Sequence, residues 1–96
     1  MITRIVKMTF LSEHTAEFEK VFAEVSPNIS KFRGCTGLKL FKDLKDPGVY
    51  FTFSTWEHEE DLETYRQSSL FRDTWQKTKP LFAARAEAWS VQNMLK

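Results

Sequence analysis

The apolar residues change their spacing along the chain in a set order, and this order constrains the fold more than any other feature. Residues 2–11 alternate as in a half-buried strand, with Val6 and Met8 on one face. Residues 13–32 carry an apolar stripe at three- and four-residue spacing, which predicts an amphipathic helix bent at Pro27. The chain is therefore expected to begin with a strand and a long helix.

The rest of the chain is expected to form two strands joined in a hairpin, a second helix and a last strand. Residues 38–43 and 49–56 predict two strands, and the Asp-Pro-Gly turn at 46–48 joins them in a hairpin. Residues 58–80 predict a second helix with a break at its two serines, and 84–92 predict the last strand. The fold expected is α+β and ferredoxin-like βαββαβ, with a four-stranded antiparallel sheet and both helices on one face.

The length of 96 residues suits a single domain over residues 1–96. Nine Phe, three Trp and two Tyr are more rings than so small a surface exposes at low cost. The helices can cover only one face of the sheet. The third strand nevertheless carries large side chains on both faces, including Phe51 and Phe53 on the face that the helices leave open. We therefore expect a homodimer that forms through the open sheet face.

Charge and composition exclude several classes of partner. The formal net charge of +1 gives no electrostatic case for nucleic acid or for an anionic membrane. Arg33-Gly34 precedes Cys35 and the second strand, unlike the RNP1 signature of RNA-binding domains. No apolar run reaches the 18 residues or so of a membrane helix, and a lone cysteine suits a reducing compartment. The expected location is the cytoplasm.

Residues that could bind a metal or a cofactor do not form a recognisable pattern. His14, His58 and Cys35 lack the close spacing of zinc ligands. Cys35 is also more simply a small turn residue than a nucleophile, because the sequence indicates no base beside it. Gly-rich phosphate loops and the GxSxG elbow are missing as well. We expect neither a metal nor a cofactor.

The second half of the chain carries a set of aromatic residues at spacings that direct them toward the sheet. Trp56 ends the third predicted strand, Tyr65 lies on the second helix, and Phe71 and Trp75 lie on its continuation. Each ring can serve as core. Together they can also surround an apolar cavity, in which the indole and phenol groups need polar partners that a ligand or water would supply.

Three short motifs resemble one known family. Residues 32–37 read Phe-Arg-Gly-Cys-Thr-Gly and resemble a Phe-Pro-Gly-Cys-x-Gly turn. Residues 56–62 read Trp-Glu-His-Glu-Glu-Asp-Leu, and 68–71 read Ser-Ser-Leu-Phe, similar to a Trp-x-Ser-x-Glu-x-Leu and Ser-x-x-Phe pattern. These are motifs of the antibiotic biosynthesis monooxygenase superfamily of dimeric α+β barrels, and the resemblance spans about residues 2–92. It implies oxygenation of quinol- or anthrone-like aromatics without metal, flavin or haem.

The resemblance also suggests site residues. The polyketide-oxidising branch uses an Asn and a Trp around the third strand and a Tyr on the helix. Trp56 matches that Trp, whereas Thr52 and Leu62 occupy the other two places, and Tyr65 lies one helical turn from Leu62. The haem-degrading branch uses an Asn, a Trp and a His, and its places hold Val6, Tyr65 and Trp75 here. The haem chemistry is therefore not expected.

Two hypotheses follow. In the first, the chain is a cofactor-independent monooxygenase in which Trp56 donates a hydrogen bond to a bound oxyanion and Tyr65 donates or accepts a proton. In the second, it is a non-catalytic dimeric barrel that binds a small apolar ligand. The expected substrate pocket is lined by Val6, Met8, Thr52, Leu62, Phe71 and Trp75.

Overall fold

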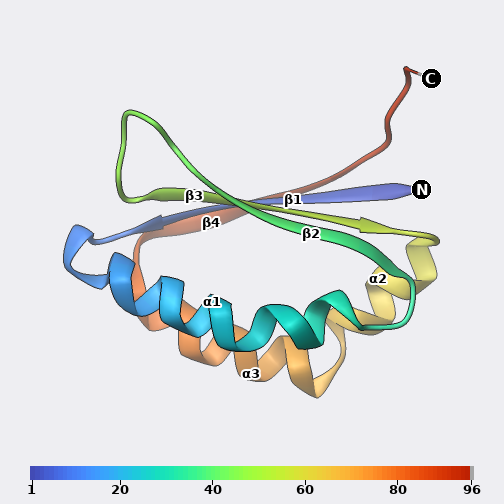
Figure 1. The fold of residues 1–96 in the computed structure, drawn as a ribbon, viewed down its shortest axis with the longest axis horizontal. Coiled ribbons are helices and arrows are strands. Elements are labelled where there is room, and N and C mark those ends of the chain that lie inside the picture. Colours follow the sequence, from blue (N-terminus) through green and yellow to red (C-terminus); the bar gives the residue numbers. More distant parts are fainter. Residues whose placement is uncertain (96) are drawn as a thin grey trace.

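A computed structural model of the chain describes residues 1–95. One layer is a sheet of four antiparallel strands and the other is formed by the helices, which all lie against the same sheet face (Figure 1). The strand order β2-β3-β1-β4 is that of a ferredoxin-like fold, and the α+β architecture predicted from the sequence is confirmed. The elements are β1 (Ile2–Phe10), η1 (Ser12–His14), α1 (Thr15–Ser30), β2 (Cys35–Lys42), β3 (Val49–Trp56), α2 (Glu59–Arg66), α3 (Ser69–Thr78), η2 (Lys79–Leu81) and β4 (Phe82–Val91).

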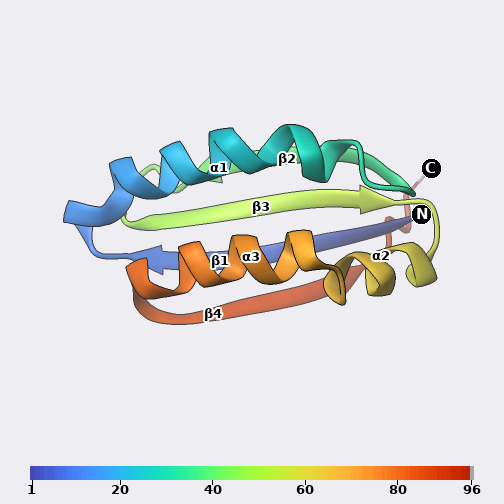
Figure 2. The same ribbon diagram turned by 90° about the horizontal axis from the view of Figure 1, so that it is seen from below.

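The helices of the second layer cover different parts of the sheet. In Figure 2, seen from the helix side, α1 runs along β2 and α3 runs along β1 beside β4, whereas the short α2 lies at the end of the sheet where β3 stops. The helix α1 continues through Pro27 as one element, as its apolar stripe predicts, but it starts and ends about two residues inside the predicted range of 13–32. A short 3₁₀ turn, η1, takes the place of its first residues.

The turn that leads into β2 is shorter than predicted, because only one of its two expected glycines, Gly34, lies in the turn. Gly34 has a φ of +86°, and a Cβ built there would lie 2.3 Å from the Asp61 side chain, so this position requires glycine. Gly37 already belongs to β2, next to a bulge at Cys35. The strand therefore begins at residue 35 instead of the predicted 38. The last strand likewise begins at residue 82 and not at 84.

The predicted break in the second helix is a true boundary. Ser68 ends the loop after α2, and its Oγ accepts a hydrogen bond from the backbone N–H of Phe71 at 3.1 Å. This cap begins α3 in a new direction, and Pro80 falls in the 3₁₀ turn that ends it. The two helices therefore present Tyr65 and Trp75 to different stretches of the same sheet face.

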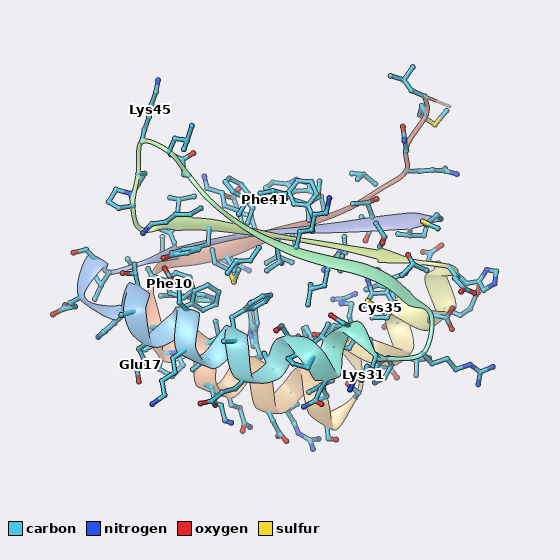
Figure 3. The ribbon with its side chains drawn as sticks, viewed as in Figure 1. Phe10, Glu17, Lys31, Cys35, Phe41 and Lys45 are labelled. Atoms are coloured by element: carbon cyan, nitrogen blue, oxygen red, sulfur yellow. The ribbon has the colours of Figure 1, made fainter. Side chains whose placement is uncertain are left out.

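The hydrophobic core is concentrated at one end of the layer between sheet and helices. Phe10, Phe18 and Tyr50 are all at most 3% exposed, and the rings of Phe10 and Phe18 stack with centroids 4.2 Å apart. In Figure 3, Phe10 points from the sheet toward α1, whereas Phe41 stands on the opposite, uncovered face. Packing is therefore dense where β1 meets α1, and it leaves space toward α2.

Among residues 1–95, no helix is both long and apolar enough to cross a bilayer.

Candidate functional site

A cavity of about 350 Å³ lies between the sheet and the helices. Most of its wall is apolar, because the inward faces of the strands and the apolar stripes of the helices meet there. Small side chains on β4, Ala86 and Ala88, leave the volume that larger ones would fill. The residues around it are Arg4, Val6, Met8, Phe18, Phe22, Ile29, Leu38, Thr52, Ser54, Leu62, Tyr65, Arg66, Phe71, Thr74, Trp75, Thr78, Ala86 and Ala88.

A continuous series of aromatic rings borders one side of the cavity. Trp56 stacks on Tyr65 with centroids 5.1 Å apart, and Tyr65 meets Phe71 edge to face at 5.3 Å. Phe71 stacks on Trp75 at 5.9 Å, one helical turn further along α3. Offset and edge contacts of this kind stabilise the arrangement beyond simple burial. The rings predicted from the sequence thus form one connected wall.

Trp56 belongs to this wall but is set behind the cavity surface. Its side chain is completely buried, and its Nε1 donates a hydrogen bond to the Ser54 Oγ at 2.9 Å. Ser54 is itself 8% exposed and lines the cavity. The indole N–H therefore already has an acceptor inside the protein, and the polar group that reaches the cavity from this pair is the Ser54 hydroxyl.

Tyr65 lines the cavity directly. Burial, and to a lesser extent the neighbouring Cys35 thiol, raise the pKa of the Tyr65 phenol to about 12. Within residues 1–95, its O–H makes no hydrogen bond. At neutral pH this group is consequently a neutral phenol that has a proton to donate and no internal acceptor for it.

Two further hydroxyls reach the cavity from α3. The Thr78 Oγ1 donates to the Thr74 backbone carbonyl at 2.7 Å and is thereby satisfied. The Thr74 Oγ1, in contrast, is buried and has no hydrogen-bond partner among the described residues. Buried hydroxyls are normally paired, so an unpaired one that lines a cavity is a candidate contact for a bound molecule.

The end of the cavity nearest α2 is positively charged. Arg4 faces inward from β1, where it pairs in register with Ser54 on one side and Ser90 on the other. Arg66, at the end of α2, lines the same cavity, and its side chain is 44% exposed. The exposed Arg66 marks where the cavity meets solvent.

The structure brings all six expected pocket residues to this one cavity, together with Tyr65. Trp56 is the exception, because it contacts the site through Tyr65 and Ser54. The roles assigned to these residues in binding and catalysis stay predictions. Sequence analysis missed Arg4, Ser54 and Thr74. For Arg4 a signal existed, because an arginine on the inward face of an otherwise apolar strand is unusual.

Within the described part of the chain, no group of three His, Cys, Asp or Glu side chains is arranged to hold a metal ion.

Comparison with known proteins decides the family. The family model for antibiotic biosynthesis monooxygenases matches residues 1–77. The chain belongs to this family. The matched segment contains every residue that lines the cavity except Thr78, Ala86 and Ala88.

Solved structures of the same family share the fold over almost the whole chain. A Bordetella bronchiseptica protein, provisionally named an antibiotic biosynthesis monooxygenase, is 25% identical, with a TM-score of 0.88 over 98% of this chain and 97% of that one. A Caulobacter crescentus protein with the same provisional name is 19% identical, with a TM-score of 0.90 over 98% of this chain and 90% of that one. None of the curated proteins matches the chain.

Proposed function

We propose that this member of the antibiotic biosynthesis monooxygenase family is a cofactor-independent monooxygenase that oxidises a small quinol- or anthrone-like aromatic with O₂. The observation that carries the proposal is the cavity of about 350 Å³, which combines an apolar, ring-lined body with two guanidinium groups and several hydroxyls in its lining. Its volume lies near the lower end of the range of about 300–1,000 Å³ typical of small-molecule sites. A molecule of one to three fused rings suits such a space.

The chemistry requires little from the protein. An electron-rich aromatic anion can itself reduce O₂, so the site needs to bind it away from water and favour its ionised form. For an anthrone-like CH₂ group, one oxygen atom of O₂ becomes the new carbonyl oxygen. The other leaves as water with the two hydrogens of that carbon. For a quinol with a free ring C–H, one oxygen atom becomes the hydroxyl of a hydroxyquinone and the other again leaves as water. In both cases the substrate supplies all four electrons, so no external reductant is needed.

Tyr65 and Ser54 have complementary parts in this scheme. Since the Tyr65 pKa is about 12, its phenol acts as a hydrogen-bond donor to a substrate oxyanion and not as the base that deprotonates it. Ser54 accepts from Trp56 and so has its own O–H free to donate into the cavity. Trp56 is then a positioning residue that orients Ser54. The positive field of Arg4 and Arg66 favours the anionic form of the substrate.

The protein is further proposed to act as a homodimer. The uncovered face of the sheet carries apolar side chains, and Phe41, Trp89 and Val91 are between 41% and 46% exposed. Phe41 and Phe53 meet edge to face there with centroids 5.2 Å apart. Large exposed apolar side chains grouped on one sheet face are typical of an interface, and a second copy offers a matching surface.

A non-catalytic role has one observation in its favour. The Trp56 N–H is satisfied internally, so fewer polar groups converge on the cavity than the sequence suggests. In that case the chain binds a small apolar molecule without changing it.

Oxygen uptake by the purified, metal-free protein distinguishes the two functions. A panel of hydroquinones, naphthoquinols and anthrones is offered to the wild type, to Tyr65→Phe and to Trp56→Phe. The monooxygenase predicts protein-dependent uptake that falls about tenfold or more in Tyr65→Phe, because a donor to the developing oxyanion is lost. A smaller loss is expected for Trp56→Phe. Uptake no faster than the uncatalysed rate with every compound would contradict oxygenation and favour the binding role.

A further inference from the structure

Two guanidinium groups converge on the same end of the cavity from different elements. Arg4 extends inward from near the start of the inner strand β1, and Arg66 comes from the last turn of α2. The two side chains are close enough for the charge of Arg66 to lower the pKa of Arg4, second only to the effect of burial. Holding two like charges together in a partly buried position costs free energy, and a bound anion would offset that cost.

The protein neutralises this charge only in part. Arg66 Nη1 lies 3.4 Å from the Glu63 Oε2, and Glu63 also acts weakly on Arg4. Arg4 itself donates from Nη1 to the neutral Ser90 hydroxyl at 3.0 Å, and no carboxylate among residues 1–95 forms an ion pair with it. One carboxylate thus faces two guanidinium groups, and the cavity end keeps a net positive charge.

We propose that the cavity binds an aromatic carboxylate, with its ring in the apolar body and its carboxylate between Arg4 and Arg66. This inference deepens the proposed function by naming the substrate class, and it rests on that function only for the oxidation that follows binding. The oxidised ring would carry the carboxylate as a substituent, as in a dihydroxynaphthoate.

The chemistry of the cavity favours a carboxylate over other anions. A guanidinium group is planar and presents paired donors that match the two oxygens of a carboxylate. The rest of the wall is apolar and aromatic, which suits a flat ring and excludes a strongly hydrated sugar or a polyphosphate. The hydroxyls of Ser54, from the sheet, and Thr74, from α3, line the same cavity and can meet substituents on that ring.

Calorimetric titration with the redox-inert pair 2-naphthoate and 2-naphthamide tests the inference. The two molecules have nearly the same shape, and only the first carries a charge. The full-length protein is expected to bind 2-naphthoate about ten- to a hundredfold more tightly, the effect of a charge-assisted hydrogen bond. Equal affinities for the two would overturn the inference.

Variants of Arg4 and Arg66 test whether these two guanidinium groups cause the preference for the carboxylate. Arg4→Met and Arg66→Met are each expected to remove most of the preference for the acid over the amide, whereas Arg4→Lys keeps part of it. The matched control is Arg72→Met, because Arg72 is an exposed α3 residue that does not line the cavity. Retention of the full preference in both methionine variants would contradict the proposal. Since the Arg66 side chain is 44% exposed, its substitution is expected to leave the fold intact even if that of Arg4 does not.

The outcome of this binding experiment does not depend on whether the protein is an oxygenase. Neither naphthalene compound is a quinol, so their binding does not depend on turnover. Selective binding of 2-naphthoate without oxidation of any quinol would support the carboxylate site and contradict the oxygenase. If the protein oxidises 1,4-dihydroxynaphthalene at least as efficiently as 1,4-dihydroxy-2-naphthoate, the oxygenase would be supported and the carboxylate site contradicted.

Discussion

The Trp56 Nε1 donates a hydrogen bond to the Ser54 Oγ at 2.9 Å, and both side chains lie on the inward face of strand β3. The indole is completely buried, whereas Ser54 lines the cavity. This pair links the packing of the core to the polar end of the site. Because the serine oxygen accepts from the indole, its own proton is directed to another acceptor, and the cavity is where an acceptor can come from.

A double-mutant cycle on this pair is expected to show strong coupling. Ser54→Ala leaves the indole N–H buried without a partner and should lower the free energy of unfolding by about 1–3 kcal/mol. Trp56→Phe should lower it by a similar amount, mainly through lost volume. Once the indole is gone, the serine change costs less, so the double variant should fall short of the sum by roughly 1 kcal/mol. Urea denaturation measures all four proteins, and strict additivity would show that the hydrogen bond contributes nothing.

The pH dependence of stability is expected to report the raised pKa of Tyr65. In the unfolded chain its phenol ionises near its ordinary pKa of 10, but in the folded chain only near about 12. Stability is therefore complete below pH 10 and falls as the pH rises from 10 toward 12, because only the unfolded state loses the proton. Chemical denaturation at pH 8, 10 and 11, followed by fluorescence, should show this decline.

Tyr50 supplies the control for that measurement. Its pKa is also raised to about 12, by burial first and then by its hydrogen bond to Glu19. In Tyr65→Phe, the loss of unfolding free energy at pH 11 should be smaller than in the wild type by roughly 1–2 kcal/mol, and Tyr50 should account for the remaining decline. It should leave stability at pH 7 almost unchanged, since the Tyr65 O–H has no internal partner. An unaltered decline in Tyr65→Phe would mean that this phenol ionises normally.

Much of the fold follows from local rules that the sequence makes visible. The third strand was predicted at its observed bounds because β-branched and aromatic residues fill it between a Pro-Gly turn and a run of acids. The errors lie at turns. The glycines at 34 and 37 look alike in sequence, yet only Gly34 has a positive φ, and its close neighbour Asp61 is distant along the chain. A contact of that kind cannot be read from spacing.

The site was predictable in its apolar part and not in its polar part. Helical spacing fixes which faces carry Tyr65, Phe71 and Trp75, so their convergence on the sheet follows from periodicity. Which donor meets which acceptor depends on side-chain rotamers and strand register. The bond from Trp56 to Ser54 and the approach of Arg66 to Arg4 therefore appear only in three dimensions.

The unpaired Thr74 hydroxyl leads to a prediction with a matched control. Thr74→Val removes a buried oxygen that has no partner, and it should raise the free energy of unfolding by about 1 kcal/mol. Thr78→Val removes an oxygen bonded to the Thr74 carbonyl and should lower it by about 1 kcal/mol. Both changes keep the shape and the helix propensity nearly constant. Thermal unfolding in the absence of ligand compares them, and destabilisation in both variants would indicate that Thr74 has a partner in solution, such as water.

The open sheet face yields the last prediction. Trp89 alternates with the cavity-lining Ala88, so its ring lies on the uncovered face, and it is 45% exposed in the isolated chain. If this face forms the dimer, Trp89→Glu places an unpaired charge in the interface and should weaken association at least about a hundredfold. Leu11→Glu is the control, because Leu11 is 44% exposed but lies in the turn between β1 and η1, away from that face. Sedimentation velocity at micromolar concentration should find wild type and Leu11→Glu as dimers and Trp89→Glu as a monomer. A monomeric wild type, or a Trp89→Glu variant that stays dimeric, would refute an interface built on this face.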